Sequence, residues 1–157
     1  REWAARDPAV DAIRVDLRIT TTWTDKDFAR ASRAVARYDS GPVFEEQDLE
    51  ALRDCLAGHR DLLLRLLENP VLFEHEAFTD VLRAVFHLAD ELENRGDLSA
   101  LPSSDTAHLA GDIKRAYLLL IREWLQYMRH LKDTYPYLFS LAARTNPFDP
   151  QASAVVA

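Results

Sequence analysis

The chain has few cysteines, few glycines and no long apolar run, and each shortage argues against a class of protein. A single cysteine, Cys55, cannot form a disulfide within the chain, which is typical of a reducing cytosol, and its leucine neighbours predict a buried, inert thiol. Only 4 glycines among 157 residues argue against a glycine-rich loop that cradles phosphate. No apolar run approaches the roughly 20 residues of a membrane span, and no signal peptide opens the sequence.

Basic residues are also scarce, and the shortage is confined to the middle of the chain. The formal net charge is −7, and residues 39–105 carry 16 acidic but only 5 basic side chains. Such an acidic belt repels phosphate, so we expect no nucleic-acid partner. The belt is interpreted as a solvated outer face or, alternatively, as a surface for a basic protein partner.

Apolar residues at helical spacing fill most of the sequence. The longest stripe runs from Ser104 to Tyr135 and predicts a helix of roughly 48 Å, ended by Pro136. Its apolar positions are Leu109, Ile113, Ala116, Tyr117, Leu120, Trp124, Met128, Leu131 and Tyr135. A short helix is predicted at residues 137–143.

Three more helices are predicted at residues 24–38, 45–68 and 74–95. Thr24 is the expected cap of the first, with Asp27 three residues later. Gly58 predicts a kink or a close helix contact in the second, and Gly96 is expected to end the third in a left-handed conformation.

The first 23 residues fit two secondary structures. Ile13, Val15, Leu17 and Ile19 alternate with polar residues, as in a half-buried strand, whereas Val10, Ile13 and Leu17 also share one helical face. The threonines that follow favour the strand. The predicted fold is therefore all-α, an antiparallel bundle of about four main helices and a short C-terminal helix, with one N-terminal strand as an option. Residues 1–23 form the first segment, 24–144 the bundle, and 145–157 an extended tail.

Residues of metal-ligand type occur without a known pattern. His87 and Glu91 lie one turn apart, but the two Glu-x-x-His motifs of a di-iron bundle are absent, and only the pair Asp105 and His108 comes near. Asp80, Arg83, His87 and Glu91 are more simply interpreted as a charged outer stripe. The sequence predicts no metal site, no cofactor and no catalytic residue, so we expect a protein that is not an enzyme.

Aromatic residues gather near the end of the chain, and they predict either a packed end of the core or a partner-binding surface. The predicted interaction residues are Trp124, Tyr127, Tyr137, Phe139, Arg144 and Phe148. The expected partner is another copy of the chain, in a homo-oligomer.

Four segments resemble the C-terminal cytoplasmic region of prokaryotic potassium-channel-like proteins. They lie at residues 74–80, 84–88, 108–117 and 135–149. The resemblance implies a non-catalytic assembly or regulatory domain on the cytoplasmic side of the inner membrane, attached to membrane segments upstream of Arg1. The selectivity-filter motif of such channels does not occur in this sequence. The alternative is a freestanding cytoplasmic helical adaptor that binds a basic partner through the acidic belt.

Overall fold

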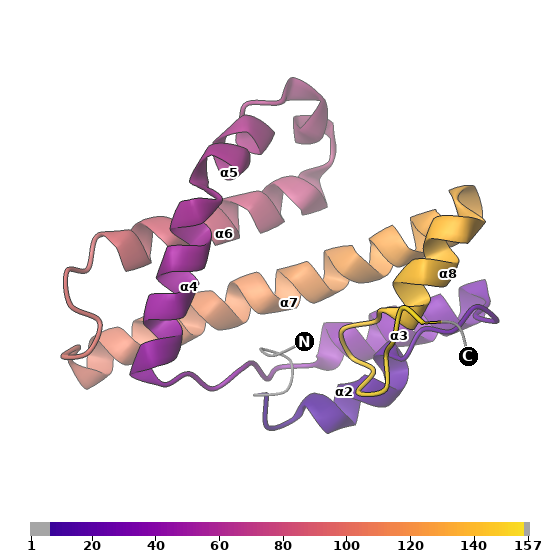
Figure 1. The fold of residues 1–157 in the computed structure, drawn as a ribbon, viewed down its shortest axis with the longest axis horizontal. Coiled ribbons are helices and arrows are strands. Elements are labelled where there is room, and N and C mark those ends of the chain that lie inside the picture. Colours follow the sequence, from indigo (N-terminus) through magenta and orange to yellow (C-terminus); the bar gives the residue numbers. More distant parts are fainter. Residues whose placement is uncertain (1–6, 156–157) are drawn as a thin grey trace. The chain divides into compact units, whose positions relative to one another are not determined.

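The structure is a computed structural model that describes residues 7–155, except the side chains of Glu46 and Phe73. Its regular elements, within these residues, are all helical, so the predicted all-α class is confirmed (Figure 1). They are α2 (Val10–Leu17), α3 (Asp25–Arg37), α4 (Glu46–Gly58), α5 (Arg60–Leu67), the 3-10 helix η1 (Pro70–Glu74), α6 (Glu76–Glu93), α7 (Ser103–Thr134) and α8 (Pro136–Arg144).

The long helix α7 agrees with its prediction. It has 32 residues, starts at Ser103 and stops just before Pro136, which becomes the first residue of α8. Proline suits this position because the first helical N–H has no intrahelical partner. The described chain forms two compact units, and α7 contributes to both. One unit combines the residues up to Pro42 with those from Ile121 onward, and the other is Val43–Leu120.

In the first unit, the strand favoured for residues 13–19 is wrong, because α2 is a helix. Val10, Ile13 and Leu17 are buried, whereas Val15 is 77% exposed. A strand with Ile13 and Leu17 inward would also bury Val15, so the helical period decided the structure. Thr24 caps α3 as predicted, through a capping box with Asp27, and the first residue of the helix is Asp25.

The first unit is closed by a buried asparagine from the segment predicted to be a tail. The amide nitrogen of Asn146 donates to the carbonyl of Leu17 at 2.7 Å, and its amide oxygen accepts from the N–H of Phe148 at 2.8 Å. The ring of Phe148 is buried and lies 5.3 Å from that of Trp124, centroid to centroid. Asn146 therefore joins parts of the chain that are 129 residues apart.

In the second unit, the helix predicted at residues 45–68 is divided into α4 and α5. The interruption falls at His59, next to Gly58, where the sequence predicted a kink. Two local predictions are wrong. Cys55 is exposed, because α4 buries the face of Leu49 instead. Gly96 is not left-handed, since no described glycine has a positive φ.

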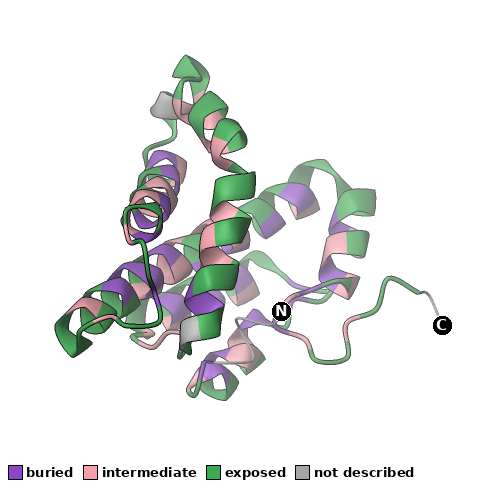
Figure 2. Ribbon diagram, turned by 60° about the vertical axis from the view of Figure 1, so that its left-hand side comes forward, coloured by how far each residue is buried: buried purple, intermediate pink, exposed green. Residues whose placement is uncertain are grey.

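The core of the second unit places α6 beside the first half of α7. Buried residues recur along one side of the helices (Figure 2). They form one hydrophobic cluster made of Leu49, Leu88, Leu92, Leu98, Leu109, Ile113 and Ala116. Four of these residues directly follow a histidine or an acidic residue in the sequence, namely Leu88, Leu92, Leu109 and Ile113. The packing of the core thus fixes where those polar side chains meet.

Candidate metal centre

Two short stretches of the second unit share one pattern. Residues 87–92 read His-Leu-Ala-Asp-Glu-Leu on α6, and residues 108–113 read His-Leu-Ala-Gly-Asp-Ile on α7. Each places a histidine and a carboxylate four residues apart, on the same side of a helix. The apolar residue after each of them packs into the shared core. The two His-carboxylate pairs therefore face each other.

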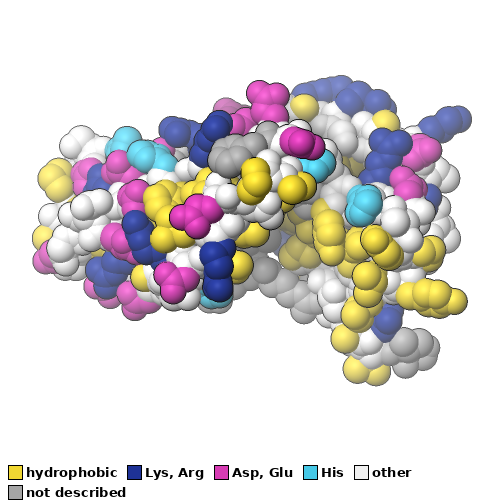
Figure 3. All heavy atoms as spheres, turned by 90° about the horizontal axis from the view of Figure 1, so that it is seen from above, with side chains coloured by type: hydrophobic (Ala, Val, Ile, Leu, Met, Phe, Trp, Pro, Cys, Tyr) yellow, Lys and Arg dark blue, Asp and Glu magenta, His cyan; other side chains and the backbone are white. Residues whose placement is uncertain are grey.

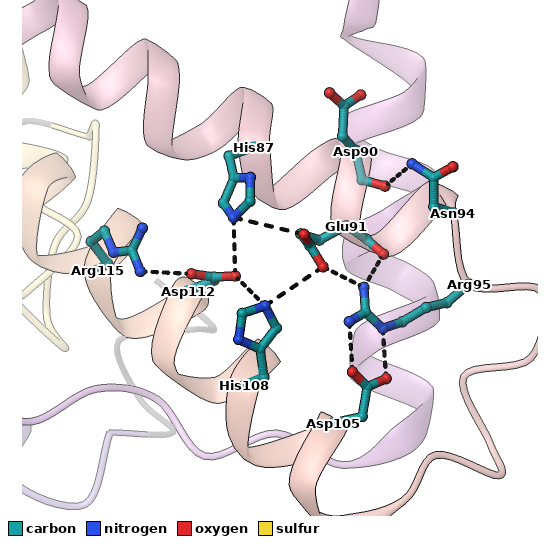
Figure 4. Close-up of polar contacts among 9 residues, drawn as sticks. All are labelled: His87, Asp90, Glu91, Asn94, Arg95, Asp105, His108, Asp112 and Arg115. Atoms are coloured by element: carbon teal, nitrogen blue, oxygen red, sulfur yellow. Dashed lines mark hydrogen bonds and ion pairs between the residues drawn. The ribbon is translucent and has the colours of Figure 1, made fainter.

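The structure brings the four polar side chains to one point (Figure 4). The Nε2 atoms of His87 and His108 both lie 3.4 Å from Oδ2 of Asp112. The carboxylate of Glu91 lies 3.8 Å from Nε2 of His87 and 3.6 Å from Nε2 of His108. The ligand atoms of Glu91, His108 and Asp112 are all within 4.8 Å of one another.

Asp112 is the buried member of this cluster. Its side chain is 2% exposed, whereas the side chains of His87 and His108 are about half exposed. Its Oδ1 atom lies 2.9 Å from a guanidinium nitrogen of Arg115. Its Oδ2 atom is buried and has no hydrogen-bond partner among the residues that the structure describes. A buried charged oxygen without such a partner is costly, so its surroundings call for a further positive group.

Glu91 is held in its ionised form by a neighbouring arginine. Arg95 donates to the Glu91 carboxylate at 2.7 Å, and this hydrogen bond lowers the pKa of Glu91 below its usual value. Arg95 also binds both oxygens of Asp105, at 2.6 and 2.7 Å, and lowers the pKa of that carboxyl. Glu91 is therefore a carboxylate with a fixed orientation, as a metal ligand requires.

The four histidine–carboxylate contacts are longer than direct hydrogen bonds and are compatible with a shared ion, and the three residues whose ligand atoms all lie close to one another are Glu91, His108 and Asp112. Nitrogen–oxygen hydrogen bonds are about 2.7–3.2 Å long, and the four contacts in the cluster measure 3.4 to 3.8 Å. In a tetrahedral zinc site with bonds of about 2.0–2.1 Å, neighbouring ligand atoms lie about 3.3–3.4 Å apart. Two imidazoles and two carboxylates are a donor set for a divalent transition metal.

The prediction from sequence does not include this cluster. It places His87 and Glu91 in a charged outer stripe, and it pairs His108 with Asp105 rather than with Asp112. The signal in the sequence was the repeated spacing of histidine and carboxylate within two similar hexapeptides. Glu74, His75 and Glu76 are also of metal-ligand type, and they are exposed around the start of α6.

The predicted interaction residues belong to the first unit, and the structure gives them different surroundings. Phe139 and Phe148 are buried, and Trp124 is half-buried against Phe148. Tyr127 and Tyr137 are 53% and 94% exposed. The half-buried Arg144 donates to the carbonyl of Ala154.

Exposed apolar side chains occur on the protein surface, as the face in Figure 3 shows. On α8 they include Tyr137, Leu138 and Leu141, which are 94%, 55% and 45% exposed. Of these, only Tyr137 is among the predicted interaction residues, and self-association through the predicted residues stays a prediction.

The fold and the site together define an all-α domain with a two-histidine, two-carboxylate cluster between paired helices. A comparison with known protein families identifies the family to which the chain belongs. The family model described as the C-terminal helical domain of the uncharacterized protein MJ1433 matches residues 1–144, and the chain belongs to this family.

One relative is the uncharacterized protein MJ1433 of Methanocaldococcus jannaschii. It is 52% identical to this chain over 140 residues, which are 89% of the chain and 57% of the relative. The chain thus spans little more than half the length of that protein. No solved structure matches the chain.

The expected kinship with potassium channels is wrong. Both the family model and the relative identify the helical domain of MJ1433, and neither is described as a channel or as a potassium transporter. The resemblance rested on short similar stretches without any residue of a pore. In the part of the chain that the structure describes, no helix combines the length and apolar character that crossing a membrane requires.

Proposed function

We propose that this domain binds one divalent metal ion through His87, Glu91, His108 and Asp112, and that the ion links α6 to α7. The observation that carries the proposal is the buried Oδ2 atom of Asp112. It has no hydrogen-bond partner among the described residues, and it lies 3.4 Å from the Nε2 atoms of both histidines. An ion bound among these atoms would supply the missing positive charge.

The proposed role of the ion is structural. Four protein ligands complete a tetrahedral shell, whereas catalytic zinc sites keep one position open for water or substrate. The ligands come in pairs from two helices, so the free energy of binding adds to the stability of the folded pair. This role agrees with the expectation from sequence that the protein is not an enzyme.

The charge of the second unit supports a cation as ligand. Residues 43–120 carry 16 acidic and 7 basic side chains. An excess of carboxylates raises the local concentration of cations and repels anions. The belt that the sequence analysis interpreted as a solvated face would thus also favour the approach of the metal ion.

The test is calorimetric titration of the metal-free chain with zinc chloride. We expect one ion per chain for the wild type, and at least tenfold weaker binding for His108→Ala, because even changes behind the ligands typically cost about 10–100-fold in metal affinity. The control is His130→Ala, since His130 is an exposed histidine of the same helix that packs on Tyr135 in the first unit. Equal zinc affinity of wild type and His108→Ala would refute the proposal, as would an equal loss in the control.

A further inference from the structure

We infer that Arg95 and Arg115 make this site selective for transition-metal ions such as Zn²⁺ and Co²⁺ over Mg²⁺ and Ca²⁺. The inference rests on the proposed metal-binding function and concerns the class of ion. It starts from the two arginines of the cluster, each of which is paired with one of the two carboxylates (Figure 4).

Each arginine occupies one carboxylate oxygen. Arg115 takes Oδ1 of Asp112 at 2.9 Å and leaves Oδ2 facing the two imidazoles. Arg95 donates to Oε2 of Glu91 at 2.7 Å. This same oxygen lies 3.6 Å from Nε2 of His108, whereas Oε1 lies 3.8 Å from Nε2 of His87. Asp112 is thereby directed to bind an ion through Oδ2 alone, and Glu91 keeps only Oε1 free of the arginine. The site then offers two nitrogens and two such oxygens.

Hard cations bind weakly to such a set of two nitrogen and two oxygen ligands. Ca²⁺ takes about 6–8 oxygen ligands, with bidentate carboxylates among them, and Mg²⁺ takes octahedral oxygen ligands with several waters. Zn²⁺ and related ions bind imidazole nitrogen strongly and accept four ligands. Two single oxygens beside two imidazoles therefore favour the second class of ion.

The arginines also reduce the negative charge that attracts every divalent cation alike. Glu91, Asp112 and Asp105, which shares Arg95 with Glu91, contribute three negative charges, and Arg95 and Arg115 contribute two positive ones that stay protonated in proteins. The two arginines therefore weaken the electrostatic attraction of the site for cations without cancelling it. The bonds from His87 and His108 are then the main source of affinity, and these bonds distinguish one metal from another.

The two arginines act as positioning residues, and their surroundings differ. Arg95 is 17% exposed and is itself fixed by Asp105, so its replacement would also disturb the connection between α6 and α7. Arg115 is 61% exposed, so its side chain can be shortened without opening the core. Arg115 is therefore the residue on which the inference can be tested.

The experiment uses Co²⁺, whose visible spectrum reports the number and geometry of its ligands, in competition with Mg²⁺ and Ca²⁺. The measured quantity is the selectivity ratio, the dissociation constant for Ca²⁺ divided by that for Co²⁺. For Arg115→Gln we expect this ratio to fall at least tenfold, because Asp112 loses its orientation and regains a free oxygen. Arg115→Lys keeps the positive charge and should restore the ratio to within about threefold of the wild type.

The matched control is Arg83→Gln. Arg83 lies on α6, is 64% exposed and pairs with Asp80 three residues away at 3.6 Å, so it repeats the spacing and exposure of Arg115 away from the cluster. We expect its selectivity ratio to equal that of the wild type. A ratio that is unchanged in Arg115→Gln, or that falls equally in Arg83→Gln, overturns the inference.

The wild type separates failure of the inference from failure of the proposed function. If it binds one Co²⁺ per chain but binds Ca²⁺ or Mg²⁺ equally tightly, the inference on selectivity fails and the metal-binding function stands. If it binds no ion at one per chain, the proposed function fails and the inference falls with it.

Discussion

Replacing Asn146 by alanine is expected to lower the free energy of unfolding by about 3 kcal/mol. Asn146 is fully buried, and its side chain satisfies the carbonyl of Leu17 and the N–H of Phe148. Alanine would leave both backbone groups unpaired, and each buried unpaired group costs roughly 1–3 kcal/mol. Urea denaturation followed by circular dichroism measures the loss.

The control for this prediction is Asn94→Ala. Asn94 also donates a side-chain hydrogen bond to a backbone carbonyl, that of Asp90, but it is exposed at the end of α6. Water can replace its amide, so we expect a change within about 0.5 kcal/mol. If both substitutions have the same effect, the buried amide does not hold the two ends of the first unit together.

Replacing Leu109 by alanine is expected to cost about 3 kcal/mol, because a cavity opens in the core of the second unit. Leu109 is 0% exposed and belongs to the cluster that packs α6 beside α7. Its neighbour His108 is a proposed metal ligand, so the substitution should also weaken zinc binding. The measurement is urea denaturation of the metal-free chain, followed by a zinc titration.

Leu120→Ala is the matched control, since Leu120 lies on the same helix but is 47% exposed. We expect it to cost less than about 1 kcal/mol and to leave zinc affinity unchanged. A loss of stability from Leu120→Ala as large as that from Leu109→Ala would contradict the assignment of the core.

Helices with long, uninterrupted apolar stripes and clear stop residues could be predicted from the sequence. The helix α7 is the clearest case, since its stripe extends to Pro136, and α3 follows with its cap at Thr24. Residues 10–17 could not be decided, because Ile13 and Leu17 fit both a strand and a helix. Only the exposure of Val15 separates the two, and the sequence does not show exposure.

The candidate metal centre depends on the packing of α6 beside α7, which the spacing of residues along the sequence does not predict. Each His-carboxylate pair is visible in the sequence, but the contact between Asp112 and His87 arises only when the core places α6 beside α7. The Glu-x-x-His spacing of di-iron bundles differs from the spacing in these two helices, where a histidine precedes a carboxylate by four residues. The similar hexapeptides at 87–92 and 108–113 were the local sign that both helices carry the same arrangement.

The most direct test of the metal centre is a crystal structure of the chain grown with equimolar zinc, with diffraction data collected on both sides of the zinc absorption edge. We predict one anomalous peak per chain, at bonding distance from Nε2 of His87, Nε2 of His108 and the carboxylates of Glu91 and Asp112. A well-ordered cluster without an anomalous peak, or zinc bound only at other residues, would contradict the account.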